Sequence, residues 1–454
     1  MASDDTSQLN DSEVLDSVAG KSLERETSSI TVPPPAKKGL LRAFTSLRHR
    51  NYRLYWFGQL ISVLGTSMQA IGQIWLVVEL SHSAWQIGLI GALQALPVLL
   101  FSIFAGVFAD RWPKRQVLFI TQSIAMVQAF LLWILITTGT LQLWHLYLLA
   151  LLLGLTSSLS RPTGQAFIVE LVGREDLPNA VALRFSLSTL ANIAGPGFGG
   201  LIIASGGVGL LFLLNALSFI PAIVSLGLIK SSELQTSTAQ SHGNHKSQST
   251  WQSLREGLVY VWKTPAILLV IVVVGLVLLF GSNYNVVLPF FATDVLHTGA
   301  TGFGFLSAAI DLGALLSTLW LAWSNQQPTI RRLLLAMLVF VLLEIIFAVS
   351  HIYLLSLVAV AGIGFMEGTF AMQAVTALQA ATPDHLSGRV MSVQTLLFDG
   401  SLPLGYLLIG WLTGLYGAPK AMIIGALLSL VIVTVGWIWR WSGEKKGRVE
   451  LLRI

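Results

Sequence analysis

Twelve apolar stretches, each about 20 residues long, follow one another along the chain with polar breaks between them. A helix needs about 20 apolar residues to cross the roughly 30 Å hydrocarbon core of a bilayer. Strands of a membrane barrel are about 10 residues long and alternate apolar with polar positions, which these runs do not. The pattern predicts an all-α membrane protein with twelve transmembrane helices, over residues 52–79, 86–109, 117–138, 146–167, 181–203, 208–229, 266–292, 302–323, 333–350, 353–380, 389–412 and 418–441.

A polar stretch rich in Ser, Gln, Thr and His, residues 230–250, separates the sixth run from the seventh. A weak repeat supports two halves, since Gln165 and Asp176 in the first match Gln373 and Asp384 in the second at the same offset. Transporters are often built from repeated halves with substrate bound between them. We therefore expect two six-helix bundles, organised as a disordered cytoplasmic tail (1–36), a first half (37–229), a cytoplasmic linker (230–263), a second half (264–441) and a cytoplasmic tail (442–454).

Charge is scarce and unevenly placed. Only 11% of residues are charged, against about a quarter in a soluble domain. Nearly all Lys and Arg residues fall on one side of the predicted helices, which is the cytoplasmic side by the positive-inside rule. The prediction is a multi-pass protein of the inner (plasma) membrane with both termini cytoplasmic. The net charge of +5 reflects this bias and gives no reason to expect a nucleic-acid partner. The chain has no cysteine, which excludes disulfides and thiolate metal sites, and we expect no metal or cofactor.

The loop between the second and third helices reads Gly-Val-Phe-Ala-Asp-Arg-Trp-Pro-Lys-Arg over residues 106–115. It resembles the signature of the major facilitator superfamily at this loop, with Pro113 in place of a Gly. Asp110 is able to sit at the positive end of a helix and pair with an Arg, holding one conformation. The alternative is that the charges only fix topology. The candidate latch consists of Gly106, Asp110, Arg111, Lys114, Arg115 and Arg389.

In the fifth helix, residues 191–200 read Ala-Asn-Ile-Ala-Gly-Pro-Gly-Phe-Gly-Gly, which resembles the motif of exporters of the antiporter type. Its candidate residues are Gly195, Pro196, Gly199 and Gly200; ordinary close packing of helices is the alternative. With residues 49–62 and 170–180, the motif resembles the branch of the superfamily containing enterobactin exporters and macrolide efflux pumps. That resemblance implies a major facilitator fold and a proton-driven exporter.

Polar side chains recur at spacings of three and four along the first helix, so they share one face. A polar face inside hydrocarbon must meet a cavity or a partner helix, and either substrate contact or interhelical hydrogen bonding satisfies it. Arg161 in the fourth helix is expensive unless it is paired or hydrated; it either holds an anionic substrate group or bonds Glu170 or backbone carbonyls. The candidate cavity residues are Gln59, Ser62, Thr66, Gln69, Gln73, Arg161, Gln165, Asn283, Asn285 and Gln373.

Few carboxylates lie inside the predicted spans, and proton coupling requires one that gains and loses a proton. The resemblance places the first, fourth, seventh and tenth helices around the cavity. This ranks Glu367 first as proton carrier, followed by Asp311 and Asp399. Glu344, on the peripheral ninth helix, is read as structural.

The leading hypothesis is therefore secondary active export of a small amphiphilic molecule, drug-like or siderophore-like, by proton antiport with alternating access. The expected partners are this substrate, protons and the lipid bilayer, with the chain acting as a monomer. Uptake of a polar nutrient is the alternative within transport. A membrane enzyme or scaffold is a remote alternative, because the chain has no H-E-x-x-H zinc motif, no nucleophile elbow and no complete phosphate loop.

Overall fold

A computed structural model describes residues 40–235, 250–324 and 327–445, without the side chains of residues 40–43, 102–111, 250–253 and 443–445. Contacts divide the chain after Thr45, and the unit Ser46–Ile454 holds every membrane helix. The 3-10 helix η1 (Leu40–Arg48) spans this division. The helices of the first half are α2 (Arg50–Ser81), α3 (Ala84–Arg111), α4 (Lys114–Thr137), α5 (Leu143–Val172) and α6 (Leu177–Leu228).

The second half follows the same plan with one interrupted helix. Its elements are α8 (Pro265–Gly281), α9 (Tyr284–Phe290), the π-helix η4 (Phe291–Val295), α10 (Gly299–Ser324), α11 (Ile330–Val349), α12 (Tyr353–Ala381), α13 (Asp384–Tyr416) and α14 (Ala418–Lys445). Helix α8 ends at Gly281 because Ser282 and Asn283 leave helical geometry, and α9 resumes at Tyr284. The segment Pro265–Val295 still crosses the membrane once.

Eleven helices in the described residues are long and apolar enough to span a bilayer. One of them, α6, has 52 residues, about 78 Å at 1.5 Å per residue, which is more than twice the hydrocarbon thickness. Its chain turns at Gly207, where φ is 77°, a left-handed value that glycine adopts without strain. Since α6 therefore crosses twice, the twelve predicted crossings and the all-α fold are confirmed.

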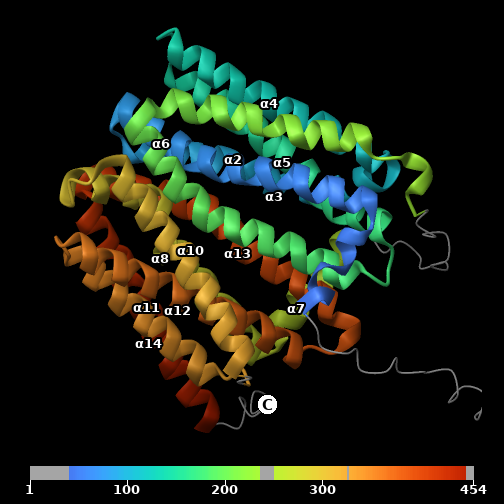
Figure 1. Ribbon diagram of the computed structural model, residues 1–454. Helices are drawn as coiled ribbons and strands as arrows, with labels where there is room; N and C mark the ends of the chain where they lie inside the picture. The colour runs from blue at the N-terminus through green and yellow to red at the C-terminus, as the bar shows by residue number, and fades with distance from the viewer. Residues whose placement is uncertain (1–39, 236–249, 325–326, 446–454) are drawn as a thin grey trace, which may run out of the picture. The chain divides into compact units, whose positions relative to one another are not determined.

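Helices from each half of the sequence pack mainly among themselves (Figure 1). In the first half α6 packs on α2 and α4, and α3 packs on α5; in the second, α12 packs on α10 and α11. The two halves meet along two helix pairs, α6 with α10 and α3 with α13. These pairs bound the space between the halves.

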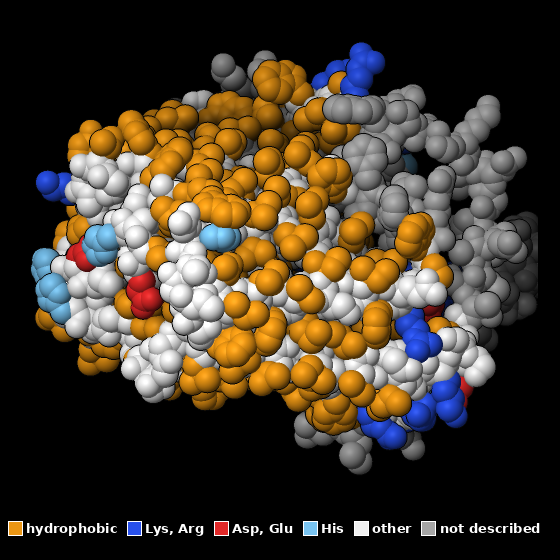
Figure 2. All heavy atoms as spheres, turned by 90° about the horizontal axis from the view of Figure 1, so that it is seen from above, with side chains coloured by type: hydrophobic (Ala, Val, Ile, Leu, Met, Phe, Trp, Pro, Cys, Tyr) orange, Lys and Arg blue, Asp and Glu red, His pale blue; other side chains and the backbone are white. Residues whose placement is uncertain are grey.

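The outer surface is apolar, as hydrocarbon requires. Figure 2 shows hydrophobic side chains over most of one face, with charged side chains gathered toward its ends. Large side chains such as Phe185, Trp323 and Leu354 are exposed on helix faces. In water such a surface would be unfavourable, whereas it is the normal surface of a helix in lipid.

The range expected to be a linker contains a helix that its polar composition did not suggest. Helix α7 (Thr250–Lys263) packs on α13 and α8, and the short 3-10 helix η2 (Ser231–Glu233) precedes it. Helix α14 continues to Lys445, into the range predicted as a C-terminal tail. The predicted disordered tail, residues 1–36, lies outside the described residues.

Candidate functional site

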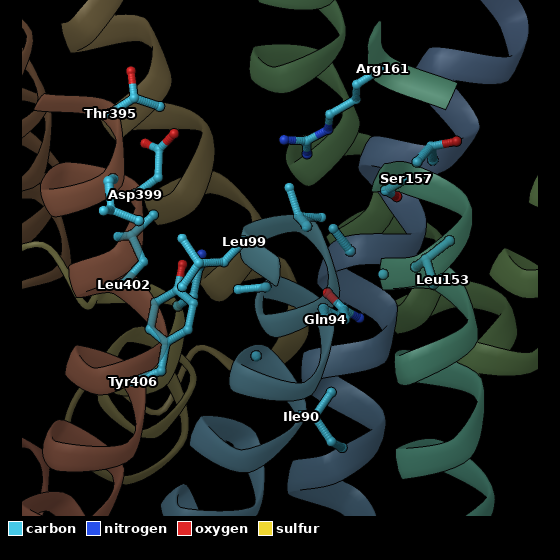
Figure 3. Close-up of a pocket in the computed structure, with 18 of the residues that line it drawn as sticks. Ile90, Gln94, Leu99, Leu153, Ser157, Arg161, Thr395, Asp399, Leu402 and Tyr406 are labelled. Atoms are coloured by element: carbon cyan, nitrogen blue, oxygen red, sulfur yellow. The ribbon is translucent and has the colours of Figure 1, made fainter. Parts of the chain in front are cut away.

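A cavity of about 1070 Å³ lies between the two halves of the bundle. Its walls come from α2, α3 and α5 of the first half and from α7, α9 and α13 of the second. Figure 3 shows side chains of α3, α5 and α13 projecting into it. Much of the wall is aliphatic, including Ile74, Ile90, Leu99, Leu153 and Leu402. The volume lies at the upper end of the range for small-molecule sites.

Opposite charges face one another across this cavity. Arg161 on α5 and Asp399 on α13 point toward each other from opposite walls, and their charges interact (Figure 3). Asp399 is the one carboxylate among the described residues that line the cavity. Glu170, the alternative partner considered for Arg161, pairs with Lys114 instead, with Nζ and Oε1 2.7 Å apart. Within the described residues no hydrogen bond or ion pair holds Arg161, so its guanidinium is available to a ligand.

The polar face of α2 divides into two parts. Thr66, Gln69 and Gln73 line the cavity, where the Oε1 atom of Gln73 accepts a hydrogen bond of 2.9 Å from the Gln94 amide. Gln59 and Ser62 do not line it, because both contact Gln122 on α4, at 3.4 and 3.3 Å.

Gln69 also belongs to a buried amide chain that joins three helices. It donates to Gln128 on α4 at 3.0 Å and accepts from Asn215 on α6 at 2.5 Å. Cavity lining and interhelical hydrogen bonding, the two alternatives raised for the polar face of α2, therefore both occur on that face.

The other polar candidates divide in the same way. Asn285 on α9 lines the cavity, whereas Gln165, Asn283 and Gln373 do not. Asn283 is buried in the break between α8 and α9 and donates to the Leu279 carbonyl at 2.8 Å. Sequence reasoning missed three polar lining residues, Gln94, Thr395 and Tyr406; each is a polar side chain in an apolar run, which is the signal that identified the others.

The membrane carboxylates occupy different environments. Asp399 lines the cavity, whereas Glu367 on α12 and Asp311 on α10 lie outside it. Glu367 is partly buried within the second half, close to the hydroxyl groups of Ser282 and Tyr284. The sequence ranked Glu367 first as proton carrier, yet of these three carboxylates Asp399 is the one that lines the cavity.

Lys114, Arg115 and Arg389, three basic residues of the expected latch, each contact groups on their own side of the bundle. Besides the Lys114–Glu170 pair, Arg115 donates to the carbonyls of Leu226 and Gly227 at 2.6 and 2.8 Å. Arg389 pairs with Glu256 of α7 and lines the cavity. At Gly106, Asp110 and Arg111 the structure describes the backbone of α3 alone, so the proposed Asp110 contact stays a prediction.

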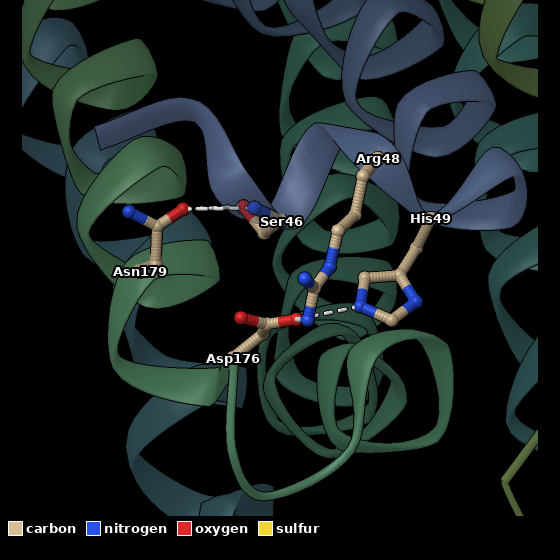
Figure 4. A network of polar contacts seen from close by, with 5 residues as sticks. All are labelled: Ser46, Arg48, His49, Asp176 and Asn179. Atoms are coloured by element: carbon tan, nitrogen blue, oxygen red, sulfur yellow. Dashed lines mark hydrogen bonds and ion pairs between the residues drawn. The ribbon is translucent and has the colours of Figure 1, made fainter. Parts of the chain in front are cut away.

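A further ionic contact fixes the start of α6. Asp176 lies just before this helix and accepts hydrogen bonds from the His49 ring at 2.7 Å and from the Arg48 guanidinium at 2.8 Å (Figure 4). The hydrogen bond from His49 contributes most, and together the two bonds hold the pKa of the Asp176 carboxyl below its usual value. Beside this pair, the Ser46 hydroxyl of η1 donates to the Asn179 side chain at 2.7 Å, which ties the segment before α2 to the beginning of α6.

The glycine-rich motif that the sequence placed in the fifth predicted crossing lies on α6. Its glycines permit close contact with two other helices. A Cβ on Gly195 would lie 2.5 Å from the Cβ of Ser67 on α2. One on Gly200 would lie 2.6 Å from the carbonyl oxygen of Ala300 on α10, and the Pro196 carbonyl occupies the matching position against Gly304. Gly199 lies within ordinary contact of Met68 on α2. The motif thus forms a seam between the halves.

The seam marks the closed end of the cavity. At the same end, Trp75 of α2 stacks on Phe303 of α10 with ring centroids 6.2 Å apart. A Cβ on Gly410 of α13 would lie 2.8 Å from the Ala84 carbonyl of α3. At the opposite end, His385 and Gly388 in the first turns of α13 line the cavity. The cavity therefore extends toward the end of the bundle that carries most Lys and Arg residues.

Two groups of six membrane crossings around a central cavity define a secondary transporter of the major facilitator superfamily. The chain belongs to the transmembrane secretion effector family, whose model matches residues 41–446. It is a multi-pass inner-membrane transporter with a small-molecule substrate, and not an enzyme.

Two sets of known proteins resemble the chain. It is 27% identical over 398 residues to the enterobactin exporter EntS of Escherichia coli O1:K1, and 28% identical to that of Shigella boydii; each match covers 85% of this chain and 92% of the relative. Among solved structures, the nucleoside transporter NupG superimposes with a TM-score of 0.70 at 12% identity, covering 86% of this chain and 98% of that one. A bacterial homologue of the human lysosomal transporter Spinster, inward-facing and unoccupied, gives 0.69 at 13% identity, covering 86% and 96%. The structural matches support the fold alone.

Proposed function

We propose that this protein exports a small amphiphilic organic molecule, drug-like or siderophore-like, by proton antiport with alternating access. The observation that carries the proposal is the cavity between the halves, with aliphatic walls and with Arg161 facing Asp399. Such a site suits a molecule with an apolar body and polar groups at separate positions. Arg161 offers donors to an anionic or acceptor group, and Asp399 offers acceptors to a cationic or hydroxyl group.

Export is favoured over uptake by two observations. The matching family is described as a secretion effector, and the similar curated proteins are named exporters. The fifth-helix motif, which resembles that of antiporter-type exporters, forms the seam between the halves at Gly200. Opening this seam while the other end closes would transfer the cavity from one side of the membrane to the other.

Asp399 provides a way to couple substrate to protons. Antiport requires that the proton and the substrate exclude one another, and a carboxylate in the substrate's own cavity meets this condition. A cationic or donor group on the substrate binds the ionised form of Asp399, whereas a bound proton removes the charge that holds it. Arg161 faces Asp399 across the cavity, so substrate and proton meet the same pair of charges.

The test uses purified protein in liposomes with an imposed pH gradient and a panel of macrolides, fluorescent dyes and catecholate siderophores. We expect a probe to accumulate against its gradient when the pH gradient has one sign and not when it is collapsed. Asp399→Asn should abolish this dependence while preserving exchange of probe at equal pH. Arg161→Gln should raise KM about tenfold or more, with Arg161→Lys in between.

Glu175→Gln is the matched control, because Glu175 is exposed in the loop before α6 and should have no effect. Probe movement that ignores the pH gradient in the wild-type protein would refute antiport. Full coupling in Asp399→Asn would instead mean that another residue carries the proton.

A further inference from the structure

Glu344 on α11 is a carboxylate buried among apolar groups. It is 1% exposed, and its Oε2 atom has no hydrogen-bond partner among the described residues. Its Oε1 atom lies against Gly281 at the end of α8; a Cβ there would be 3.3 Å from this oxygen and 2.8 Å from the Phe340 ring. An ionised carboxylate in such a place would be an unpaired buried charge, which is strongly unfavourable. The side chain therefore holds a proton when the site is dry.

The packing of α11 on α12 places Glu344 opposite Glu367. These helices are neighbours joined by a short turn, so they run antiparallel. The rings of Phe340 and Phe370 meet at right angles with centroids 5.3 Å apart. Glu344 lies one turn after Phe340, and Glu367 lies about one turn before Phe370, so the two carboxylates share one level of the bundle. Their charges interact.

Hydroxyl groups at the break between α8 and α9 complete the cluster. Tyr284 is 8% exposed, its hydroxyl has no hydrogen-bond partner in the described part of the chain, and the group lies near both Glu344 and Glu367. The Ser282 hydroxyl, which also has no such partner among the described residues, lies close to Glu367. A buried hydroxyl without a partner is unfavourable, and one aimed at two carboxylates has a natural role in passing a proton.

The cluster reaches the central cavity through one residue. Tyr406 on α13 lines the cavity and interacts with Asn285 and Glu367. Asp311 on α10 is a further titratable group that interacts with Glu367. A line of ionisable and hydroxyl groups thus runs from the cavity wall into the second half.

We propose that Glu344 and Glu367 form a two-carboxylate proton-binding site within the second half, connected to the central cavity through Tyr284 and Tyr406. The proposal rests on the proposed antiport and adds Glu344, a residue whose position on α11 suggests only a structural role. Two neighbouring carboxylates do not both ionise readily, so the pair retains one proton more readily than a lone carboxylate does. A second proton leaves the pair to water or to the cavity when the site becomes hydrated, and returns by the same route.

The experiment compares Glu344→Gln with Glu79→Gln, a carboxylate at the outer end of α2 that bonds Trp75 and lies outside the cluster. In liposomes, Glu344→Gln should lower pH-driven accumulation of the probe about tenfold or more and preserve exchange at equal pH. Infrared spectroscopy of the purified protein gives a readout without substrate: the C=O band of neutral carboxylic acids should diminish in Glu344→Gln and in Glu367→Gln, and not in the control.

Tyr284→Phe guards against a folding defect in Glu344→Gln. It removes a hydroxyl that has no hydrogen-bond partner among the described residues, so it should leave the melting temperature unchanged or raise it, and yet slow coupled transport. Full coupling in Glu344→Gln together with an unchanged carboxylic-acid band would overturn the proposal. A wild-type protein that ignores the pH gradient would refute antiport alone, since the infrared measurement reports proton binding independently.

Discussion

Replacing Gly200 by Ala should shift the transporter away from the conformation described here. The added Cβ would lie 2.6 Å from the Ala300 carbonyl oxygen and 3.1 Å from the Gly304 Cα atom. Both are backbone atoms of α10, so no side-chain rotation relieves the overlap. The contact is relieved when α6 and α10 separate, which is the movement expected when the closed end of the cavity opens.

The size of this shift follows from the strain. One methyl group too many in a well-packed contact costs about 1–3 kcal/mol, which changes an equilibrium between two states about 5- to 150-fold. The transporter alternates between a state open at the Lys/Arg-rich end, described here, and a state open at the other end. If both were equally populated in the wild type, the population of the state described here would fall from about one half to about one sixth or less.

The absence of native cysteine makes this shift measurable. Ser392 is exposed on the cavity wall near the Lys/Arg-rich end, so Ser392→Cys provides one thiol whose reaction with a maleimide reports access. In inverted and right-side-out vesicles, Gly200→Ala should slow labelling from the Lys/Arg-rich side about threefold or more and speed it from the other side. Gly414→Ala is the matched control, because a Cβ at Gly414 would meet nothing within 4 Å.

Two results would refute the reasoning. Equal labelling rates in Gly200→Ala and wild type would mean that the seam tolerates a methyl group and does not hold the closed end together. A fall in labelling from both sides would indicate local unfolding instead of a change in access, since alternating access requires one side to gain what the other loses.

Two further predictions concern polar contacts within the first half. Because its pKa is lowered in the folded protein, Asp176 adds stability above the carboxyl's unfolded pKa of about 4, and this stability is lost as pH falls through the folded pKa. Asp176→Asn should thus lower the melting temperature at neutral pH, by about 1 kcal/mol of stability or less, with a difference that shrinks in acid; equal differences at both pH values would contradict this. Gln69→Leu leaves Gln128 and Asn215 without their partner, so it should lower stability by about 1–3 kcal/mol with little change in KM, whereas a raised KM at unchanged stability would make Gln69 a substrate contact.

The helices were predictable because the bilayer imposes a local rule. Each crossing must satisfy its own backbone hydrogen bonds with about 20 apolar residues, and that requirement is visible in any window of the sequence. The turn at Gly207 falls between the two predicted crossings within α6 for the same reason. Helix α7 was missed because it does not cross the bilayer, so its residues carry no long apolar run.

The cavity was only partly predictable, because spacing identifies a helix face and does not identify what meets it. Gln59 and Gln73 lie on one stripe of α2, yet Gln59 contacts Gln122 whereas Gln73 lines the cavity. The register of α4 against α2 decides between these outcomes, and it depends on packing across helices far apart in sequence. The same holds for Arg161, because Glu170, the alternative partner that the sequence offered, pairs with Lys114.

The search for a single proton carrier also placed two conflicting demands on one residue. A carboxylate whose proton is displaced by substrate must line the cavity, where water reaches it and favours its ionised form. Asp399 has that position. A group that holds its proton while the cavity is closed must be dry and shielded, which favours its neutral form, and Glu344 has that position. Burial cannot satisfy both demands at one atom. A proton antiporter built on this fold therefore gains from two sites joined by polar groups; Tyr406 lines the cavity as Asp399 does, and Tyr284 lies near Glu344.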